Sequence, residues 1–303
     1  MELEDIKKVL IIGAGTMGQQ IGFQCAIHGF EIALYDVAQD VLDKALTRLD
    51  KLAGGFVAAG KLSQADAKRA LDRIEISTDA ARAAGDADLV SESVPEDPDL
   101  KSRVFAQFNA LCPERTVFTT NTSSLLPSML AEATGRPDRF AAFHFHDIRF
   151  TRIVDIMPHP GTAPKTVTLI KAFADKIGQV ALVLKKENPG YLFNAMFGEL
   201  AKAAQTLAAG GVASVEDIDR AWMGVMNAPI GPFGIIDSIG LDTVLKVTDY
   251  WAEVLQDPTD EKNADFIRKY VEEGKLGTKI GRGFYDYPNP DFVKPGFIDR
   301  KEA

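Results

Sequence analysis

The segment from residue 8 to residue 36 constrains the fold of this chain more than any other. It opens with a continuous apolar run, KVLII, which is typical of a strand buried on both faces. The turn GAGTMG follows, with Gly13, Gly15 and Gly18 in G-x-G-x-x-G spacing, and the next stretch is apolar with helical period. This order of strand, turn and helix within about thirty residues predicts a dinucleotide-binding βαβ unit.

Five of the six residues of the turn have an expected role. Gly13 allows the turn, Gly15 lets the backbone approach a pyrophosphate, and Gly18 allows the helix to pack closely on the strand. The helix amino terminus favours the phosphate charge. Thr16 and Met17 lie in the same turn, so we assign them to the cofactor site as well.

Asp36 ends the second predicted strand, 18 residues after Gly18. A carboxylate in this position accepts hydrogen bonds from the ribose 2′-hydroxyl of a dinucleotide, and it repels a 2′-phosphate. The residues that follow, VAQD, contain no arginine that could hold such a phosphate. We therefore expect NAD, and not NADP, as the cofactor.

Short strands alternate with helices as far as residue 187, and from residue 188 every strong segment has helical period. Such alternation predicts a doubly wound parallel sheet. We place the boundary near Asn188–Pro189, because a residue before proline is biased away from helix. The expected architecture is a Rossmann-type α/β domain over residues 1–187, followed by a smaller all-helical domain over residues 188–303.

Composition and charge argue against several classes of function. The formal net charge of −9 disfavours general nucleic-acid binding, which normally needs a basic surface. No window approaches the roughly 18 consecutive apolar residues of a membrane span, and the acidic amino terminus is not a secretory signal. Cys25 and Cys112 lack CxxC spacing and are expected to be buried free thiols. A cytoplasmic, reducing location is the resulting expectation.

Two polar segments are candidates for chemistry. FTTNTSSLL, residues 118–126, predicts a strand that enters a loop at the sheet edge where ligands bind, although simple helix capping would also explain its Asn, Thr and Ser. FHFHDIRFTR, residues 143–152, holds two of the four histidines of the chain. His144 and His146 share one face if this segment is a strand. They could supply a base, bind a metal, or form a polar strand end.

Seven motifs occur in an order that spans essentially the whole chain. They are GAGTMG, SESVPED, NTSSL, RFAAFHF, NPGYLFN, GPFGIIDSIGLD and GKLGTKIGRGFYDY. In these motifs the chain resembles the L-3-hydroxyacyl-CoA dehydrogenase family, in which the 3-hydroxybutyryl-CoA dehydrogenases are similar in length and layout. The resemblance implies NAD-dependent oxidation of a short-chain L-3-hydroxyacyl-CoA to the 3-ketoacyl-CoA, or the reverse reduction, in fatty acid metabolism. It also implies that the helical domain contacts substrate and forms a homodimer.

The resemblance assigns catalytic roles to four residues. The family's histidine lies 23 residues after the asparagine of its Asn-Thr-Ser-Ser motif, and this position is His144 when counted from Asn121. His144 would exchange the hydroxyl proton, and Asp155 would hold its ring and stabilise the imidazolium. Ser123 would hydrogen-bond the substrate oxygen, and Asn194 would add a second contact.

The resemblance also implies contacts to the cofactor and to coenzyme A. Glu96 and Lys101 match positions that face the nicotinamide and its ribose, and Asn121 is assigned to the same site. Judged by residue type alone, Glu96 and Lys101 would be ordinary surface charges. The coenzyme A phosphates need cations, which a charged helical segment could supply unless it is only a solvated face; its cations are Lys61, Lys68 and Arg69. No metal ion is expected.

The chain departs from the family after its histidine. The family usually has His-Phe-Phe-Asn-Pro, and this chain has His-Phe-His-Asp-Ile. Asp155 follows His144 by eleven residues, one fewer than expected, and it replaces the usual glutamate. Arg149 and Arg152 stand where the family is apolar or has one lysine. We hypothesise that they hold a substrate carboxylate, as on a free 3-hydroxy acid such as gulonate. The alternative is that they pair with Asp147 or Asp155.

Two other classes of protein are alternatives. A metal-dependent hydrolase could use the histidine pair and Asp147, but it would not need the dinucleotide-binding turn, and no second His/Asp cluster completes such a site. A non-catalytic NAD-binding protein could have the same fold. The joint presence of Ser123, His144, a downstream acid and Asn194 speaks against that alternative.

Overall fold

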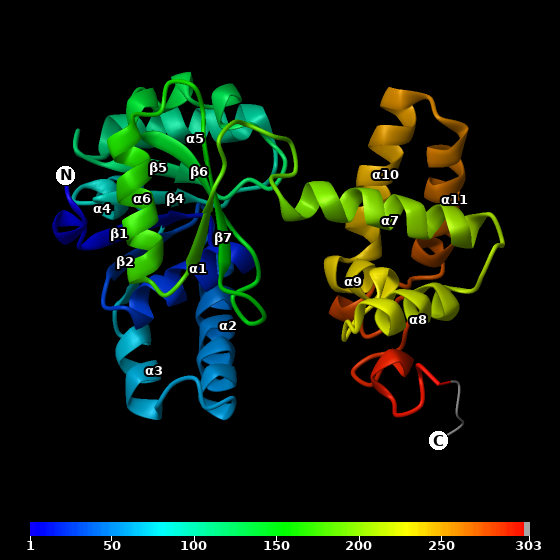
Figure 1. Cartoon of the computed structure of the whole chain (residues 1–303). Helices are drawn as coiled ribbons and strands as arrows, with labels where there is room; N and C mark the ends of the chain where they lie inside the picture. The colour runs from blue at the N-terminus through cyan, green and yellow to red at the C-terminus, as the bar shows by residue number, and fades with distance from the viewer. Residues whose placement is uncertain (300–303) are drawn as a thin grey trace. The chain divides into compact units, whose positions relative to one another are not determined.

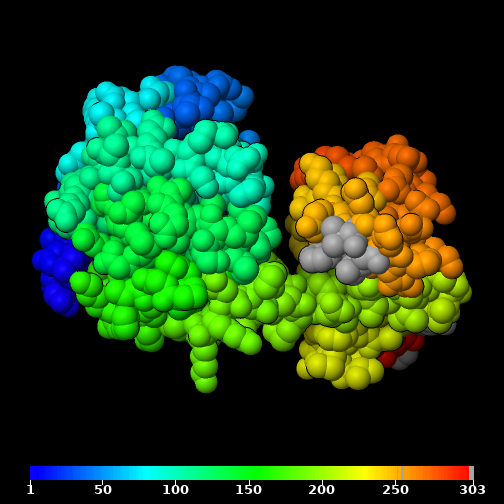
Figure 2. All heavy atoms as spheres, turned by 90° about the horizontal axis from the view of Figure 1, so that it is seen from above, coloured from blue at the N-terminus to red at the C-terminus, as the bar shows by residue number. Residues whose placement is uncertain are grey.

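The computed structural model describes residues 1–299, apart from the side chains at positions 251, 254 and 255. The chain divides into two compact units, the first covering Met1–Leu192 and the second beginning at Phe193. Figure 1 shows that the first unit is α/β and the second helical, and in Figure 2 the atoms of each unit form a closely packed body. The predicted fold class, a Rossmann-type sheet domain followed by a helical domain, is confirmed.

Eight strands form one sheet in the order β3-β2-β1-β4-β5-β6-β7-β8. The strands from β3 to β6 are parallel, β7 runs antiparallel to β6, and β8 is parallel to β7. The strand order reverses between β1 and β4, which is where open α/β sheets bind ligands, outside the carboxyl ends of their strands. The strands are β1 Lys8–Ile12, β2 Glu31–Tyr35, β3 Ile74–Ser77, β4 Leu89–Glu92, β5 Val117–Thr120, β6 Phe140–Phe145, β7 Ile153–Pro158 and β8 Val180–Val183.

The sheet has an apolar core on each face. In β1, Val9 and Ile11 pack into one cluster and Leu10 and Ile12 into another, because successive strand residues point to opposite faces. Residues of α1 and α6 belong to the first cluster, and residues of α4 and α5 to the second. The helices of this unit are α1 Thr16–Ile27, α2 Gln39–Ala58, α3 Gln64–Leu71, α4 Ala80–Ala84, α5 Pro98–Leu111 and α6 Pro164–Lys176.

The second unit packs its helices around a separate core. Phe233, Ile236, Leu241 and Ile267 are fully buried in it, and Tyr285 of the aromatic tail packs into the same core. The tail is therefore part of the packed unit. The helices of the second unit are α7 Phe193–Ala209, α8 Val215–Met226, α9 Pro232–Ile239, α10 Leu241–Leu255 and α11 Pro258–Glu272.

Both cysteines are buried and free, as predicted. Burial raises the pKa of the Cys112 thiol to about 12 and raises that of Cys25 further, so neither is a thiolate at neutral pH. Among the residues that the structure describes, no helix is long and apolar enough to cross a membrane.

Candidate active site

Close contacts shape the glycine turn between β1 and α1. Gly13 has φ +100, and a Cβ there would lie 2.7 Å from the carbonyl oxygen of Ser93. A Cβ on Gly18 would lie 1.9 Å from the carbonyl oxygen of Gly13. A Cβ on Gly15 would meet no atom within 4 Å, so the packing of the chain itself does not require glycine there. That open space fits a pyrophosphate approaching the backbone at the start of α1.

Asp36 lies beside the same turn. It follows β2, and its carboxylate accepts hydrogen bonds from the Ala14 amide at 2.9 Å and from the Ala38 amide at 3.3 Å. The acid at the end of the second strand is thus held next to the glycine turn, which is the arrangement that ribose recognition needs.

A pocket of about 280 Å³ lies at the point where the strand order reverses. Its lining comes from three segments that are far apart in the sequence: the glycine turn, SESVPEDPDLK and NTSS. The lining residues are Thr16, Met17, Ser93, Val94, Glu96, Lys101, Asn121 and Ser123. All of them except Ser93 and Val94 are predicted site residues, so the fold brings much of the predicted set into one place.

Lys101 is a buried charge, contrary to what its residue type alone predicts. It is 1% exposed, and its ammonium donates to Glu92 at 2.7 Å and to the Val94 carbonyl at 3.1 Å. Glu96 lies 3.3 Å from the same ammonium. Glu92, which is fully buried, is not among the predicted residues; its signal in the sequence is an acid at the end of an apolar strand. The two carboxylates together compensate the buried cation and hold it at the pocket.

Glu96 orders the NTSS loop. Its carboxylate accepts hydrogen bonds from the Thr122 hydroxyl, from the Ser123 and Ser124 amides at 3.0 Å, and from the Ser124 hydroxyl at 2.8 Å. Burial would raise the pKa of Glu96, but the Thr122 hydrogen bond, the charge of Lys101 and the Ser124 hydrogen bonds outweigh it and lower the pKa. An ionised Glu96 therefore holds the loop that carries Ser123.

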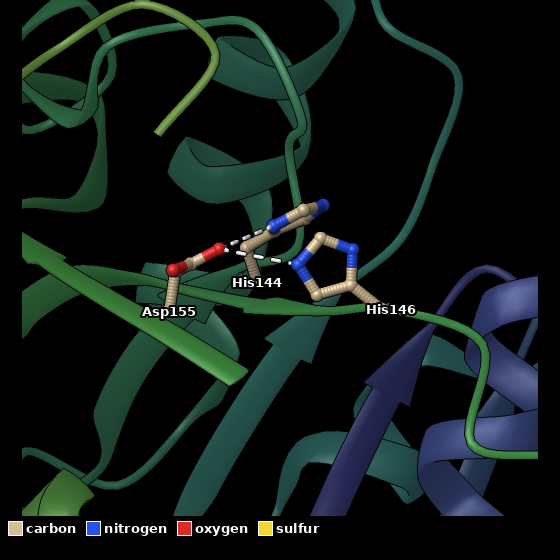
Figure 3. Close-up of side chains that lie close together, drawn as sticks. All are labelled: His144, His146 and Asp155. Atoms are coloured by element: carbon tan, nitrogen blue, oxygen red, sulfur yellow. Dashed lines mark hydrogen bonds and ion pairs between the residues drawn. The ribbon is translucent and has the colours of Figure 1, made fainter. Parts of the chain in front are cut away.

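His144 and Asp155 face each other across the antiparallel strands β6 and β7. His144 Nδ1 lies 3.2 Å from Asp155 Oδ2, and the two side chains are 6% and 1% exposed (Figure 3). The shorter acid of this chain still reaches the imidazole, because the strand register places the two residues opposite each other. Asn121, which lines the pocket, accepts a hydrogen bond from the Phe145 amide at 2.7 Å, so the pocket lining is joined to the residue next to His144.

His146 contacts the same carboxylate. Its Nε2 lies 3.4 Å from Asp155 Oδ2, and its ring centre is 4.7 Å from that of His144 (Figure 3). Burial would raise the pKa of Asp155, but the hydrogen bonds and charges of the two histidines outweigh it and hold the pKa below its ordinary value. Asp155 is therefore ionised at neutral pH.

Tyr191 lies against His144 and is not among the residues predicted from the sequence. Its ring stacks on the imidazole at 4.7 Å between centroids and 28° between planes, and the side chain is 1% exposed. Its hydroxyl has no hydrogen-bond partner among the described residues. The backbone has φ +57, which is unusual for a bulky residue, and Asn188 Nδ2 donates to its carbonyl at 2.9 Å. A tight turn thus packs an aromatic ring against the histidine, and the NPGY motif is its only sequence signal.

The remaining predicted residue and the other two histidines lie elsewhere. Asn194 is in the first turn of α7, in the second unit, and its contact with substrate stays a prediction. His28 Nδ1 lies 2.9 Å from the Gln24 carbonyl, and His159 Nε2 lies 2.9 Å from the Pro137 carbonyl. Both rings therefore form hydrogen bonds with backbone carbonyls of the first unit.

A second pocket, of about 500 Å³, lies between the start of α1, helix α2 and the loop between β6 and β7. Thr16 lines both pockets. The Arg149 guanidinium lines the second pocket and donates to both carboxylate oxygens of Asp147 at 2.9 and 3.1 Å, as the pairing alternative predicts. The Lys61 ammonium donates to the Arg149 carbonyl at 3.0 Å. The cations that line the pocket are Arg48, Lys51, Lys61 and Arg149.

The three cations expected to hold coenzyme A phosphates fall into two groups. Lys61 lines the second pocket. Lys68 pairs with Asp72 at 3.1 Å and Arg69 pairs with Asp66, and these four side chains are exposed on α3 and next to it. Lys68 and Arg69 therefore form a solvated helix face.

Comparison with known proteins identifies the family. The family model of the 3-hydroxyacyl-CoA dehydrogenase NAD binding domain matches residues 8–187, and that of the C-terminal domain matches residues 190–287. A Bacillus subtilis protein named "Probable 3-hydroxybutyryl-CoA dehydrogenase" is 34% identical over 284 residues, which is 93% of this chain and 98% of that protein.

Solved structures agree with this assignment. The (S)-3-hydroxybutyryl-CoA dehydrogenase of Ralstonia eutropha is 32% identical with a TM-score of 0.82, over 94% of this chain and 100% of that chain. A diketoreductase described for its dual catalysis of dicarbonyl compounds is 38% identical with a TM-score of 0.85, over 93% and 99% of the two chains. The predicted oxidoreductase class and NAD cofactor are confirmed with the family. The chain belongs to the 3-hydroxyacyl-CoA dehydrogenase family.

Proposed function

We propose that this chain oxidises the 3-hydroxyl of a short-chain L-3-hydroxyacyl-CoA with NAD, and reduces the 3-keto group in the reverse direction. The observation that carries the proposal is the pairing of His144 with Asp155, at 3.2 Å, in a chain of this family. Proton exchange at a hydroxyl needs a base whose pKa lies near neutrality, and imidazole has this property.

The proton chemistry follows from which atom of each residue is engaged. An ionised carboxylate can only accept hydrogen bonds, so His144 Nδ1 carries a proton and donates it to Asp155 Oδ2. His144 Nε2 is then left with a lone pair, and it takes the proton of the substrate hydroxyl. Asp155 stabilises the imidazolium that forms, and Tyr191 limits the rotation of the ring by stacking on it.

The residues around the turn fit NAD. When bound, NAD⁺ supplies the hydride acceptor for the oxidation. The open space at Gly15 admits the pyrophosphate, and Asp36 faces the turn with carboxylate oxygens that can accept from the ribose hydroxyls. Lys101 and Glu96 line the adjacent pocket, where we place the nicotinamide and its ribose. Ser123 lines the same pocket and donates to the substrate oxygen.

The second pocket offers a place for the phosphates of coenzyme A. Four cations line it, and among the residues that the structure describes only Arg149 of these four forms an ion pair with a carboxylate. Thr16 connects this pocket to the cofactor pocket, so a long ligand could extend from one to the other. Asn194 is proposed to contact the substrate as well.

A dehydrogenase of free 3-hydroxy acids or related dicarbonyl compounds is the second candidate. It is favoured by the 38% identity to the diketoreductase, which exceeds the 32% identity to the Ralstonia eutropha enzyme. The hypothesis that Arg149 and Arg152 together hold a substrate carboxylate is weakened for Arg149, because its guanidinium is already paired with Asp147. Arg152 is exposed at the start of β7 and is the arginine left for such a role.

The test is an NADH-absorbance assay against acetoacetyl-CoA, longer 3-ketoacyl-CoAs and free keto acids. We expect turnover of the CoA esters, and turnover of free keto acids alone would select the second candidate. A His144→Ala variant should lose about 10²–10⁴-fold in kcat while it binds NADH normally. Wild-type turnover by this variant would remove the base assignment.

A matched pair of lysine variants tests the coenzyme A site. Lys61→Ala should raise the KM for acetoacetyl-CoA by roughly tenfold, because it removes about 1–1.5 kcal/mol of phosphate contact. Lys68→Ala should change that KM by less than about twofold, because Lys68 pairs with Asp72 in solvent. Equal effects of the two substitutions would place the phosphates elsewhere.

Three further parts of the proposal rest on the family and the sequence. We propose that the chain forms a homodimer, that it works in the cytoplasm, and that its reaction belongs to fatty acid metabolism. Analytical ultracentrifugation measures the first of these directly, and a sedimentation coefficient of a monomer would reject it.

A further inference from the structure

His146 makes a contact that the proposed reaction does not use. Its Nε2 and the Nδ1 of His144 both lie close to one atom, Oδ2 of Asp155, at 3.4 and 3.2 Å (Figure 3). The proton exchange needs only His144 and Asp155. The second imidazole therefore has no direct part in that exchange.

The three atoms have the spacing of a tetrahedral metal site. Zn²⁺ binds histidine nitrogen and carboxylate oxygen at about 2.0–2.2 Å, which places neighbouring ligand atoms about 3.3 Å apart. The two nitrogen–oxygen distances, 3.2 and 3.4 Å, match this edge length. One ligand atom from each of the three residues lies within 4.8 Å of the other two, so the two nitrogens need to approach by at most about 1.5 Å.

The surroundings favour such a site. His144 and Asp155 are held in register on β6 and β7 and are 6% and 1% exposed, so two ligands are already positioned. The His146 side chain, just beyond β6, is 17% exposed and gives an ion a route from solvent. Imidazole nitrogen suits Zn²⁺ and its neighbours in the transition series, whereas Mg²⁺ and Ca²⁺ require oxygen ligands.

We propose that His144, His146 and Asp155 form a Zn²⁺ site whose occupation inhibits the enzyme. The ion binds Nδ1 of His144, Nε2 of His146 and a carboxylate oxygen of Asp155, and water completes the tetrahedron. With Nδ1 coordinated, the proton of the neutral His144 ring resides on Nε2. That nitrogen can then no longer accept the substrate proton. The inhibition rests on the proposed function of His144, whereas the binding does not.

Binding is measured first, without any activity assay. The protein is treated with EDTA, dialysed, and titrated with ZnCl₂ by isothermal titration calorimetry; Co²⁺ then reports tetrahedral geometry by its visible absorption. We expect one ion per chain. His146→Phe should weaken binding by at least about 10–100-fold, whereas His28→Asn, a histidine outside the site, should leave it unchanged. If His146→Phe does not fold, as judged by thermal unfolding, His146→Gln replaces it.

Inhibition is measured second, by NADH absorbance over the same Zn²⁺ concentrations. We expect activity to fall as the site fills and to return with EDTA. Absence of saturable binding at one ion per chain, or equal binding by the His146 variant, would overturn the site. Binding at the site with full activity would overturn the inhibition, and with it the assignment of His144 as base. Absence of activity on every substrate would reject the proposed function while the calorimetric result still decides the site.

Discussion

Each unit of the molecule contains a deeply buried aspartate, and the pKa values of the two are shifted in opposite directions. Asp155 in the first unit faces two imidazoles, which hold its pKa below the ordinary value against the effect of burial. Asp219 in the second unit is fully buried, and burial outweighs its hydrogen bonds and raises its pKa to about 6. Burial is common to both residues, so the partners decide the difference.

The partners of Asp219 belong to the fold. Its carboxylate accepts from the Phe233 and Gly234 amides at 2.8 and 3.0 Å, at the start of α9, and from the Tyr285 hydroxyl at 2.9 Å. A Cβ on Gly231 would lie 2.3 Å from its carboxyl carbon, so the backbone packs directly against it. Perturbed acids occur in structural networks as well as at functional sites, and the partners of Asp219 place it in the first of these classes.

The largest expected effect is on catalysis. Asp155→Asn should lower kcat by about 10²–10⁴-fold, because an amide neither fixes the His144 tautomer nor stabilises imidazolium. Asp219→Asn should leave kcat within about threefold at temperatures where the variant is folded. Steady-state kinetics on both variants, with thermal unfolding as the check on folding, measure the contrast. A similar loss of kcat in both would show that the comparison reflects folding alone.

The second effect is on stability. Asp219→Asn should lower the free energy of unfolding by about 1–3 kcal/mol at pH 7, because the amide nitrogen cannot accept from the donors that surround it. Asp286→Asn, whose side chain is 84% exposed, serves as the control and should change it by less than about 0.5 kcal/mol. Urea unfolding followed by circular dichroism gives both values. Equal midpoints for the two variants would contradict the structural role of Asp219.

The third effect is the dependence of stability on pH. The folded pKa of Asp219, about 6, exceeds its ordinary value of 3.8, so its contribution is complete below pH 4 and is lost as pH rises through 6. The free energy of unfolding should fall by up to about 3 kcal/mol over this window. The contribution of Asp155 to the free energy of unfolding depends on pH with the opposite sign, because its pKa is lowered in the folded state. Asp155 therefore contributes stability that is lost as the pH falls into the acid range.

Asp219→Asn removes the first of these two titrations. Urea unfolding of the wild type and of Asp219→Asn between pH 4 and pH 7 should therefore show a flatter pH dependence in the variant. Parallel curves would mean that Asp219 does not titrate in this range.

The smallest effect distinguishes two buried tyrosines. Tyr285→Phe removes a donor from Asp219 and should cost about 1 kcal/mol of stability. The Tyr191 hydroxyl has no partner among the described residues, so Tyr191→Phe should leave stability unchanged or slightly higher. Chemical denaturation of both variants measures the difference. A larger loss for Tyr191→Phe would reveal a partner for its hydroxyl.

Most of the proposed cofactor site could be predicted from the sequence because its signals are local. The spacing of Gly13, Gly15 and Gly18 and the acid at Asp36 follow one strand, one turn and one helix. Glu92 could not be found in this way, because its partner Lys101 lies on the next helix and only packing shows that both are buried. The contact of Tyr191 with His144 could not be predicted for a similar reason, because the stacking joins segments that are far apart in the chain.

The sequence by itself determined the fold class, the NAD cofactor and the family, because periodicity and motif order are properties of the linear chain. The sequence did not determine whether Asp155 could reach His144, because Asp155 is one carbon shorter than the family's usual glutamate and lies one residue nearer to the histidine in the chain. The register of β6 against β7 decided that point, by setting His144 opposite Asp155. The same register brought His146 to the shared oxygen and left Arg149 with Asp147, because contacts between strands and loops depend on burial and pairing in three dimensions.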